Sequence, residues 1–362
     1  MSIIEYGFKN GLIKPRPPLK RTGKIIAIIG SGPAGLASAS QLNRAGHKVV
    51  VFEKDDKIGG ILRYGIPDFK LDKSIIERRL KIWKKGGIEF NTSVNVGVDL
   101  AVPKLLKGFD AVCLAGGCRQ PRDLKIEGRA LGGIYFAMDY LIQANKRING
   151  TRISSDKLID AKDRRVVIIG GGDTGADCVG TAHRQGATCV IQIEILPKPP
   201  EFRSKNQPWP MYPVVFKTSS SHEEGNTEQK WQISTKKFIG ENGQVKKLSC
   251  VRVDGSQKDE NNRAIMQEVR GSEFQIDTDL VILALGFVHP EHSGLIKELD
   301  LELDTKGNVK TDQNYMTSIK DIFCCGDMHR GQSLIVWAIS EGRRAAYCMD
   351  KYLMGNTCLP VI

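Results

Sequence analysis

The chain has 362 residues, of which 41% are hydrophobic and 26% charged, and it exceeds the ~250 to 300 residues of a single core, so we expect two globular domains. No apolar run approaches the ~20 residues of a membrane span, and the N-terminus has no signal-peptide pattern, so secretion is not expected and the predicted location is cytoplasmic. The net charge is +12, but the basic residues are dispersed and accompany no nucleic-acid motif, which favours an acidic partner protein or simple solubility over nucleic-acid binding.

The first motif is a glycine-rich turn between a strand and a helix. Residues 24–30 (KIIAIIG) are apolar and β-branched, which predicts a buried strand, and the sequence GSGPAG then opens a helical stretch. Gly30 permits a tight turn, Gly32 lets a pyrophosphate approach the backbone, and Gly35 lets the helix pack close to the strand. Because a helix N-terminus offers unpaired N–H groups and a favourable dipole, the motif predicts a phosphate site.

An acidic residue follows at the spacing typical of a dinucleotide site. Residues 47–52 (HKVVVF) predict the next strand, and Glu53 at its end is the expected ligand of a ribose. A glycine-rich turn alone is weak evidence, because it also occurs as a plain strand-to-helix turn, but the full succession of elements argues against that alternative. Gly59 and Gly60 suit a backbone that runs alongside a flat cofactor.

The same layout occurs again further along the chain. Residues 165–170 (RVVIIG) predict a strand, and the sequence GGGDTG opens a helix that should run to Gln185 and end before Gly186. A further strand, 188–193, ends at Glu194, so the two units share one internal spacing. Two complete fingerprints predict two dinucleotides and a hydride relay between a nicotinamide and a flavin. The alternative is a duplicated scaffold that binds a single nucleotide.

Three more strands indicate how the chain is divided into domains. Residues 110–116 (DAVCLAG) and 280–286 (LVILALG) predict buried strands near the end of each unit. Residues 321–327 (DIFCCGD) predict a last strand, and an amphipathic helix from about Ser333 to Tyr352 follows, both in the first domain. The predicted fold is α/β, with two nested Rossmann-like dinucleotide-binding domains. The expected bounds are 1–150 and 290–362 for the first domain and 151–289 for the second.

Some features outside the fingerprints have plainer explanations. Residues 197–222 contain too many prolines for a regular element, and they predict a loop that either covers the nicotinamide site or is a plain surface loop. His289 and His292 lack further ligands, so no metal site is predicted. The nine cysteines include no C-x-x-C pair, and for adjacent Cys324 and Cys325 we favour packing in a buried strand over a redox dithiol.

Several segments resemble, along nearly the whole chain, the small (beta) subunit of glutamate synthase and the equivalent C-terminal region of single-chain NADH-type glutamate synthases. These segments exceed what generic nucleotide binding requires. They are GSGPAGL (30–36), GGILRYGIPDFKL (59–71), GGGDTGADCVGTAHRQGA (170–187), LPKPPEFRSKNQPWP (196–210), ALGFVHP (284–290) and CGDMHRGQSLIVWAISEGR (325–343).

The resemblance implies the fold of the disulfide reductases, with a discontinuous FAD domain interrupted by an NAD(P)H domain, and electron transfer toward the synthesis of glutamate from glutamine and 2-oxoglutarate. It implies no catalytic acid, base or nucleophile. Asp327 would contact the ribityl chain, and the helix that opens near Ser333 would direct its positive end at the flavin pyrimidine ring. The expected FAD residues are Gly30, Gly32, Pro33, Ala34, Gly35, Glu53, Gly60, Leu62, Gly326, Asp327, Gln332, Ser333 and Leu334. The expected residues for the nicotinamide nucleotide are Gly170, Gly172, Asp173, Thr174, Gly175 and Glu194.

The chain departs from this family at its beginning. Bacterial small subunits begin with a cysteine-rich iron–sulfur domain, whereas this sequence starts at a segment that resembles that domain's exit, residues 11–24 (GLIKPRPPLKRTGK). We therefore expect a split subunit, a truncated product or a fragment. The expected partners are the glutamate synthase large subunit and a separate iron–sulfur protein.

Glu194 bears on the choice of nucleotide. An arginine is expected near this position if a 2′-phosphate is to be bound, so the acid favours NADH over NADPH. Lys198 and Arg203 lie nearby in the sequence and would offset part of the repulsion, which keeps NADPH as an alternative.

The leading functional hypothesis is an NADH-oxidising flavoprotein that supplies electrons to a glutamate synthase. One alternative is a free-standing NAD(P)H dehydrogenase that reduces a ferredoxin, a quinone or another acceptor. Another is a flavin-bearing scaffold without turnover.

Overall fold

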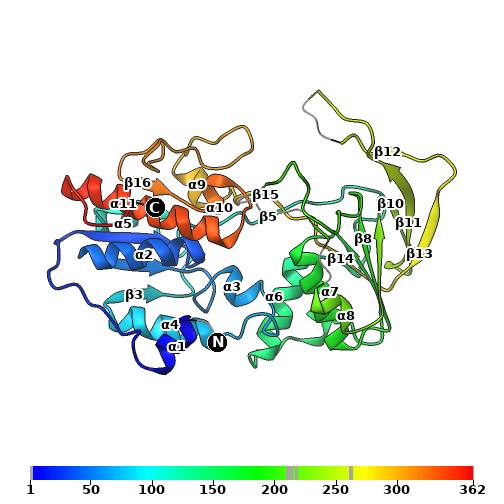
Figure 1. Ribbon diagram of the computed structural model, residues 1–362, viewed down its shortest axis with the longest axis horizontal. Coiled ribbons are helices and arrows are strands. Elements are labelled where there is room, and N and C mark those ends of the chain that lie inside the picture. Colours follow the sequence, from blue (N-terminus) through cyan, green and yellow to red (C-terminus); the bar gives the residue numbers. More distant parts are fainter. Residues whose placement is uncertain (1–2, 209–214, 217–218, 261–263, 362) are drawn as a thin grey trace. The chain divides into compact units, whose positions relative to one another are not determined.

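The segment that forms the second of two structural units is inserted within the sequence of the first (Figure 1). The computed structural model describes residues 3–208, 215–216, 219–260 and 264–361. The first unit comprises Met1–Tyr64, Asp68–Pro121 and Phe287–Ile362, and the second comprises Gly65–Pro67 and Arg122–Gly286.

The first unit is built on a sheet of five parallel strands in the order β16-β4-β1-β2-β3. Its strands are β1 (Ile25–Ile29), β2 (Lys48–Phe52), β3 (Ile88–Asn91), β4 (Ala111–Leu114) and β16 (Ile322–Cys324), with a separate antiparallel pair of β5 (Gln120–Pro121) and β15 (Phe287–His289). Its helices are α1 (Ile3–Lys9), α2 (Pro33–Ala45), α3 (Ile61–Tyr64), α4 (Ser74–Lys85), α5 (Val102–Gly108), α9 (Leu295–Glu298), α10 (Asp327–Arg330) and α11 (Ile335–Met354).

Helices cover both faces of this sheet because its strands are apolar on both sides. Successive side chains of a strand point to opposite faces, so Ile26 and Ile28 pack with α2 and α11, whereas Ala27 packs with α5 and α9. In Figure 1 the blue α2 and the red α11 lie side by side although they are far apart in the sequence. Gly342 permits this approach, since a Cβ there would lie 2.1 Å from the Ala34 carbonyl oxygen.

The second unit has a parallel sheet in the order β6-β14-β7-β8-β9 and a separate antiparallel sheet. The parallel strands are β6 (Ile134–Phe136), β7 (Arg165–Ile169), β8 (Cys189–Glu194), β9 (Thr227–Trp231) and β14 (Leu280–Leu283). The antiparallel strands are β10 (Ile233–Glu241), β11 (Gln244–Asp254), β12 (Gln267–Glu268) and β13 (Phe274–Asp277). The helices are α6 (Ala137–Ile148), the short 3₁₀ helix η1 (Ser155–Lys157), α7 (Asp173–Gln185) and α8 (Ser220–Glu223).

The two faces of this parallel sheet have different coverings. Val166 and Ile168 pack with α6 and α7, whereas Val167 and Ile169 pack with the antiparallel sheet. As the sequence predicted, α7 ends at Gln185, and the following Gly186 has the left-handed conformation of a C-terminal glycine, with φ of 89°.

The two units repeat one strand register around their glycine-rich turns. Strand β1 pairs with β2 so that Ile29 lies opposite Phe52, and β7 pairs with β8 so that Ile169 lies opposite Ile193. In each unit the first glycine of the turn then donates its backbone N–H to the carbonyl of that partner residue, at 2.8 Å. The acids at the end of the second strand, Glu53 and Glu194, therefore occupy equivalent positions.

The division between the units differs from the one that the sequence suggested. The expected boundaries were 150/151 and 289/290, whereas the observed boundaries lie at 121/122 and 286/287. The first boundary lies earlier because β6 pairs with β14 and α6 packs in the core of the second unit. Of the helices that the structure describes, none combines the length and the apolar character that a membrane span requires.

Candidate functional site

The first glycine-rich turn connects β1 to α2. Gly32 is the N-cap residue of α2 and Pro33 its first helical residue, where the missing N–H of proline costs nothing. A Cβ on Gly32 would have no heavy atom within 4 Å, so the space beside the turn is open to a phosphate group. A Cβ on Gly35 would lie 2.0 Å from the Gly30 carbonyl oxygen. Only glycine at this position therefore lets the helix start so close to the strand.

Glu53 is buried beside this turn with only 4% of its surface exposed. Its Oε2 accepts hydrogen bonds from the backbone N–H of Ser31 at 3.0 Å and from the Ser31 hydroxyl, and its Oε1 accepts one from Asp55 N–H at 3.0 Å. These three donors satisfy part of the carboxylate and hold it against the turn. A carboxylate oxygen has room for a further donor such as a ribose hydroxyl.

The segment that contains Gly60 and Leu62 lies against the same turn. The hydroxyl of Ser31 accepts a hydrogen bond from Gly59 N–H at 2.9 Å, and a Cβ on Gly60 would lie 2.9 Å from the Cα of Gly32. Leu62, in α3, packs on a small apolar cluster of the first unit. Ser31 thus joins Glu53 to the glycine pair, a role that the sequence analysis did not assign.

The loop between β16 and α10 also lies against the first turn of α2. A Cβ on Gly326 would lie 2.5 Å from the Cβ of Ala34. Asp327 begins α10, accepts a hydrogen bond from the Ser333 hydroxyl at 2.7 Å, and has a raised pKa, chiefly because burial disfavours its charged form. Asp327 and Ser333 therefore form one polar contact near the helix N-terminus of α2.

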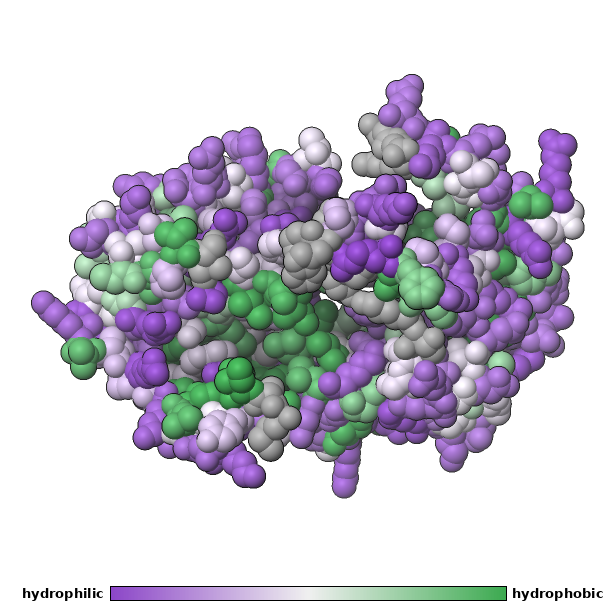
Figure 2. Space-filling view, viewed as in Figure 1, coloured by the Kyte–Doolittle hydropathy of each residue, from purple (hydrophilic) through white to green (hydrophobic). Residues whose placement is uncertain are grey.

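The remaining residues of the expected FAD set precede α11. The Gln332 side-chain oxygen accepts a hydrogen bond from Phe287 N–H at 2.7 Å. Leu334 is still extended, so α11 begins at Ile335, two residues later than predicted. Figure 2 shows apolar side chains gathered on the first unit, in the part of the view where Figure 1 draws α2 and the beginning of α11. Ile61, Leu334 and Ile339 are each more than a third exposed.

Glu341 is a second residue that the sequence analysis missed. It lies in α11 with 4% of its surface exposed, and its carboxylate accepts hydrogen bonds from Gly326 N–H at 3.0 Å and from Arg330 Nε at 2.7 Å. The signal that the sequence offered for this role is an acidic residue among the apolar and small residues of the helix. Glu341 fixes the loop that carries Asp327.

The second glycine-rich turn connects β7 to α7 in the same way. Gly172 is the N-cap residue of α7, and a Cβ there would also meet no heavy atom within 4 Å. Asp173 and Thr174 are the first helical residues, and a Cβ on Gly175 would lie 2.2 Å from the Gly170 carbonyl oxygen. The structure therefore brings the predicted residues of this turn together around one open helix N-terminus.

Glu194 contacts the second turn as Glu53 contacts the first. Its Oε2 accepts a hydrogen bond from Gly171 N–H at 2.5 Å, and its Oε1 accepts one from Leu196 N–H at 3.0 Å. The two nearby cations have other contacts: Lys198 Nζ lies 4.3 Å from the centre of the Phe216 ring, and Arg203 donates to the Gln207 carbonyl at 2.9 Å. Residues 209–214 and 217–218 of the proline-rich segment lie outside the described residues.

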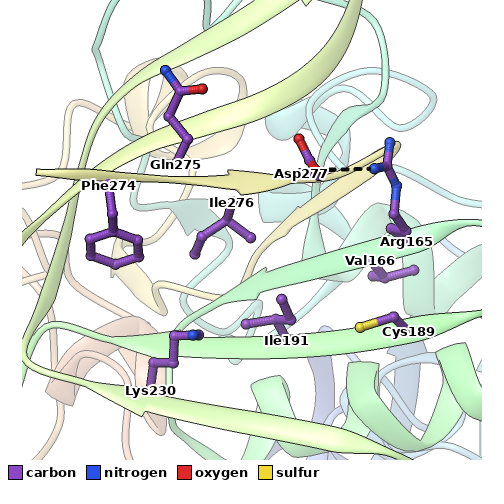
Figure 3. Close-up of a pocket in the computed structure, with 9 residues that line it drawn as sticks. All are labelled: Arg165, Val166, Cys189, Ile191, Lys230, Phe274, Gln275, Ile276 and Asp277. Carbon is purple, nitrogen blue, oxygen red and sulfur yellow. Dashed lines mark ion pairs between the residues drawn. The ribbon is translucent and has the colours of Figure 1, made fainter.

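A pocket of about 300 Å³ in the second unit contains none of these residues (Figure 3). It lies between the parallel sheet and β13, and it is lined by Arg165, Val166, Cys189, Ile191, Lys230, Phe274, Gln275, Ile276 and Asp277. Its cations are already paired, since Arg165 binds Asp279 at 2.9 Å and Lys230 binds Glu228 at 2.7 Å. The pocket is therefore separate from the glycine-rich turn, and its charges offer no site for an anion.

The cysteine and histidine pairs have the surroundings of packed side chains. Cys324 and Cys325 are fully buried, burial raises the pKa of the Cys324 thiol, and Cys325 Sγ lies 3.6 Å from Cys113 Sγ. The rings of His289 and His292 stack with centroids 4.0 Å apart, and each ring bonds a backbone carbonyl. Among the described residues, no group of three or more potential metal ligands comes together.

Comparisons with known proteins agree with the resemblance seen in the sequence. The family model described as pyridine nucleotide-disulphide oxidoreductase matches residues 24–342. The glutamate synthase [NADPH] small chain of Mycobacterium tuberculosis is 49% identical over 99% of this chain and 73% of its own length. Glutamate synthase [NADH] of Schizosaccharomyces pombe is 45% identical over 99% of this chain and 17% of its own length.

A solved structure confirms the predicted α/β fold. FprA of Mycobacterium tuberculosis, in complex with NADPH, matches with a TM-score of 0.73 and 18% identity over 94% of this chain and 85% of its own. At that identity the likeness bears on the fold alone.

Proposed function

Because this chain belongs to the pyridine nucleotide-disulphide oxidoreductases, and within them to the family of glutamate synthase small chains, we propose that it passes electrons from NADH or NADPH through FAD for the synthesis of glutamate. The observation that carries the proposal is the repeated glycine-rich turn. Each unit has an open helix N-terminus and an acid bonded to the turn, in the same strand register.

The first unit is proposed to hold FAD. The N–H groups at the start of α2 would bind the pyrophosphate, Glu53 the ribose, and Asp327 the ribityl chain. The apolar residues around α3 and the start of α11 would contact the flat ring. The positive end of α11 would face the pyrimidine part of that ring and stabilise the negative charge that develops there.

The second unit is proposed to bind the nicotinamide nucleotide, with its pyrophosphate at the start of α7 and its ribose at Glu194. When bound, the two cofactors supply hydride chemistry, and the protein supplies binding and orientation. No side chain has to act as an acid, a base or a nucleophile in this scheme.

The proposed partner is the large subunit of a glutamate synthase, because relatives that this chain matches over 73% and 74% of their own length are small chains of that enzyme. A cytoplasmic location is part of the same proposal, since the substrates of glutamate synthesis are metabolites.

Two matched substitutions test the assignment of the units. Gly32 and Gly172 are both N-cap residues in extended conformations that valine adopts, with φ of −67° and −82°, and a Cβ at either meets no neighbour. Valine should therefore fold at both positions but obstruct the phosphates. We expect Gly32→Val to purify without the yellow colour of FAD. Gly172→Val should keep the colour but no longer bleach when NADH is added without oxygen.

Wild-type protein that folds but stays colourless with added FAD would contradict the proposal. So would a Gly32→Val variant with full flavin content. Oxidation of NADH that depends on glutamine, after addition of a large subunit, would separate the glutamate synthase role from that of a free-standing dehydrogenase.

A further inference from the structure

One buried polar side chain in the second unit is not part of the dinucleotide fingerprint. Gln192 lies in β8 among apolar residues and is 3% exposed. A buried carboxamide is unfavourable unless it is hydrogen-bonded, and here both of its ends are bonded. Its Nε2 donates to the Gly170 carbonyl at 2.8 Å, and its Oε1 lies 2.7 Å from His222 Nε2 and accepts from Gln229 Nε2 at 3.2 Å.

Gln192 and Glu194 hold the two ends of one peptide bond. They are two residues apart on a strand, so their side chains point to the same face. Gln192 binds the carbonyl of Gly170, and Glu194 binds the N–H of Gly171. These two groups belong to the peptide that opens the glycine-rich turn. Its orientation is therefore fixed from both sides by side chains of the protein.

The first unit shows that a glycine-rich turn does not need this carboxamide. Val51 pairs with Ile28 in the register in which Gln192 pairs with Ile168, and Val51 is fully buried. Glu53 binds the turn in the first unit as Glu194 does in the second. The carboxamide is therefore a feature of the second unit alone.

The sequence of the second turn also leaves room for Gln192. A Cβ on Gly175 would lie 2.6 Å from Gln192 Nε2, whereas the equivalent Cβ on Gly35 would meet a methyl group of Ile28 at 3.2 Å. In this unit, Gln192 therefore excludes a side chain at Gly175, in addition to the close packing of the helix on the strand.

The other end of Gln192 holds α8, which ends the connection from β8 to β9. Because the Gly170 carbonyl needs a donor, the carboxamide must direct its NH₂ group there and its oxygen at His222. His222 then donates from Nε2, and its Nδ1 accepts from Ser219, whose backbone N–H lies 3.3 Å away and whose hydroxyl lies 2.8 Å away. This contact caps α8.

We propose that Gln192 is a positioning residue for the nicotinamide nucleotide, which fixes the Gly170–Gly171 peptide and ties it to α8 through His222. The proposal rests on the function proposed for the second unit. A turn that is already ordered loses less conformational freedom when it binds its ligand, so binding is tighter.

The test replaces the carboxamide without leaving a cavity. Gln192→Met has a similar length and no hydrogen bonds, and Gln192→Val introduces the residue of the first unit. We expect the Kd for NAD⁺, measured by calorimetry, and the KM for NADH, measured with an artificial acceptor, to rise about three- to tenfold, the range of one buried neutral hydrogen bond. The kcat should change less than about twofold and the FAD content not at all.

A matched control separates positioning from simple packing. Thr278 is fully buried in the same unit, and its hydroxyl donates to the Leu280 carbonyl at 2.9 Å, away from the turn. Thr278→Val should lower the Tm without changing the Kd for NAD⁺. If Gln192→Met lowers the Tm in the same way and also leaves the Kd unchanged, Gln192 only fills the core and the proposal is wrong.

The link to α8 has its own test. His222→Ala should raise the Kd for NAD⁺, and the double variant with Gln192→Met should bind no more weakly than Gln192→Met alone, because the two residues act through one contact. A His222→Ala variant with wild-type affinity would overturn the link. A wild-type protein that binds no NAD⁺ would instead contradict the function proposed for the unit.

Discussion

Glu53 and Glu194 show how one residue type serves both units. Each carboxylate accepts a hydrogen bond from the backbone N–H of the second residue of its turn. Each also accepts one from the backbone N–H of the residue two positions after the acid itself. The acid therefore has a structural role in addition to the contact with ribose that the fingerprint predicts. A substitution at either position removes both the bonds to the turn and the predicted contact with ribose.

Glu194→Ala is expected to shift the preference toward NADPH. The variant loses a bond to the turn, so the KM should rise for both nucleotides, but only the 2′-phosphate also gains from removal of a like charge. Two unit charges at roughly 4 Å repel by ~4 kcal/mol at an effective dielectric near 20, and a third of that value is about tenfold in affinity. The measurement is the ratio of kcat/KM for NADPH and NADH.

Glu228→Ala provides the control for this prediction. Glu228 is an exposed acid on the neighbouring strand β9, in an ion pair with Lys230 at 2.7 Å. Its removal changes the net charge by the same amount and should leave the ratio unchanged. An equal ratio in Glu194→Ala and the wild type would refute the role of Glu194 in nucleotide choice.

At the scale of elements, the sequence predicted most of the parallel strands and the helices α7 and α11, because periodicity and glycine position are local signals. Strands β1, β2, β4, β7, β8, β14 and β16 and helices α7 and α11 lie within a few residues of their expected bounds, whereas β3, β6 and β9 were not predicted. The antiparallel sheet was not predicted. Its strands mix buried and exposed residues irregularly, and register shifts near Thr235 and Ile239 disturb the alternation that identifies a strand.

The candidate site was predictable only in part, for a similar reason. Motifs name residues that are close in sequence, whereas Ser31, Gln192 and Glu341 gain their roles from partners 15 to 30 residues away or in other strands. The family, the fold and the cofactors that it implies are confirmed. The contacts of single residues with FAD and NADH stay predictions.

The end of α7 gives a prediction for an element. Gly186 has φ of 89°, a conformation that costs other residues about 1 kcal/mol or more, so Gly186→Ala should lower the free energy of unfolding by roughly that amount. Gly108, in α5, is not among the glycines with a positive φ, and a Cβ there would meet no heavy atom within 4 Å, so Gly108→Ala is the control and should not destabilise. Urea denaturation measures both. Equal stability of Gly186→Ala and the wild type would contradict the capping role.

For the whole molecule, most of the positive charge comes from two segments. Residues 1–24 contain six Lys and Arg and one Glu, and residues 70–89 contain seven Lys and Arg and three Asp and Glu, while the net charge of the chain is +12. The two segments contact each other, since Arg78 binds Glu5 and its guanidinium lies 4.1 Å from the centre of the Phe8 ring. The first unit therefore has a basic surface on α4, where Lys81, Lys84 and Lys85 are exposed.

We expect this basic surface to contribute to association with the large subunit. Replacing the exposed Lys81, Lys84 and Lys85 together by glutamate should weaken association about tenfold at low salt. The association should also depend less on ionic strength, because salt screens the attraction that these charges exert on a partner. Oxidation of NADH with an artificial acceptor should not change. Lys104, Lys107 and Lys297, also exposed in the first unit, form the control triple. Equal losses in the two triples would show that net charge alone matters.

The peptide that Gln192 and Glu194 hold has a consequence for the working cycle. FAD stays with its protein through many cycles, whereas a nicotinamide nucleotide arrives reduced and departs oxidised in each one. On the function proposed for the second unit, its turn would be vacated in every cycle and would have to receive the next molecule without rearranging. A peptide held by two side chains would keep its shape during these intervals, so the unit proposed to exchange its ligand is the one whose turn has the additional bond from a carboxamide.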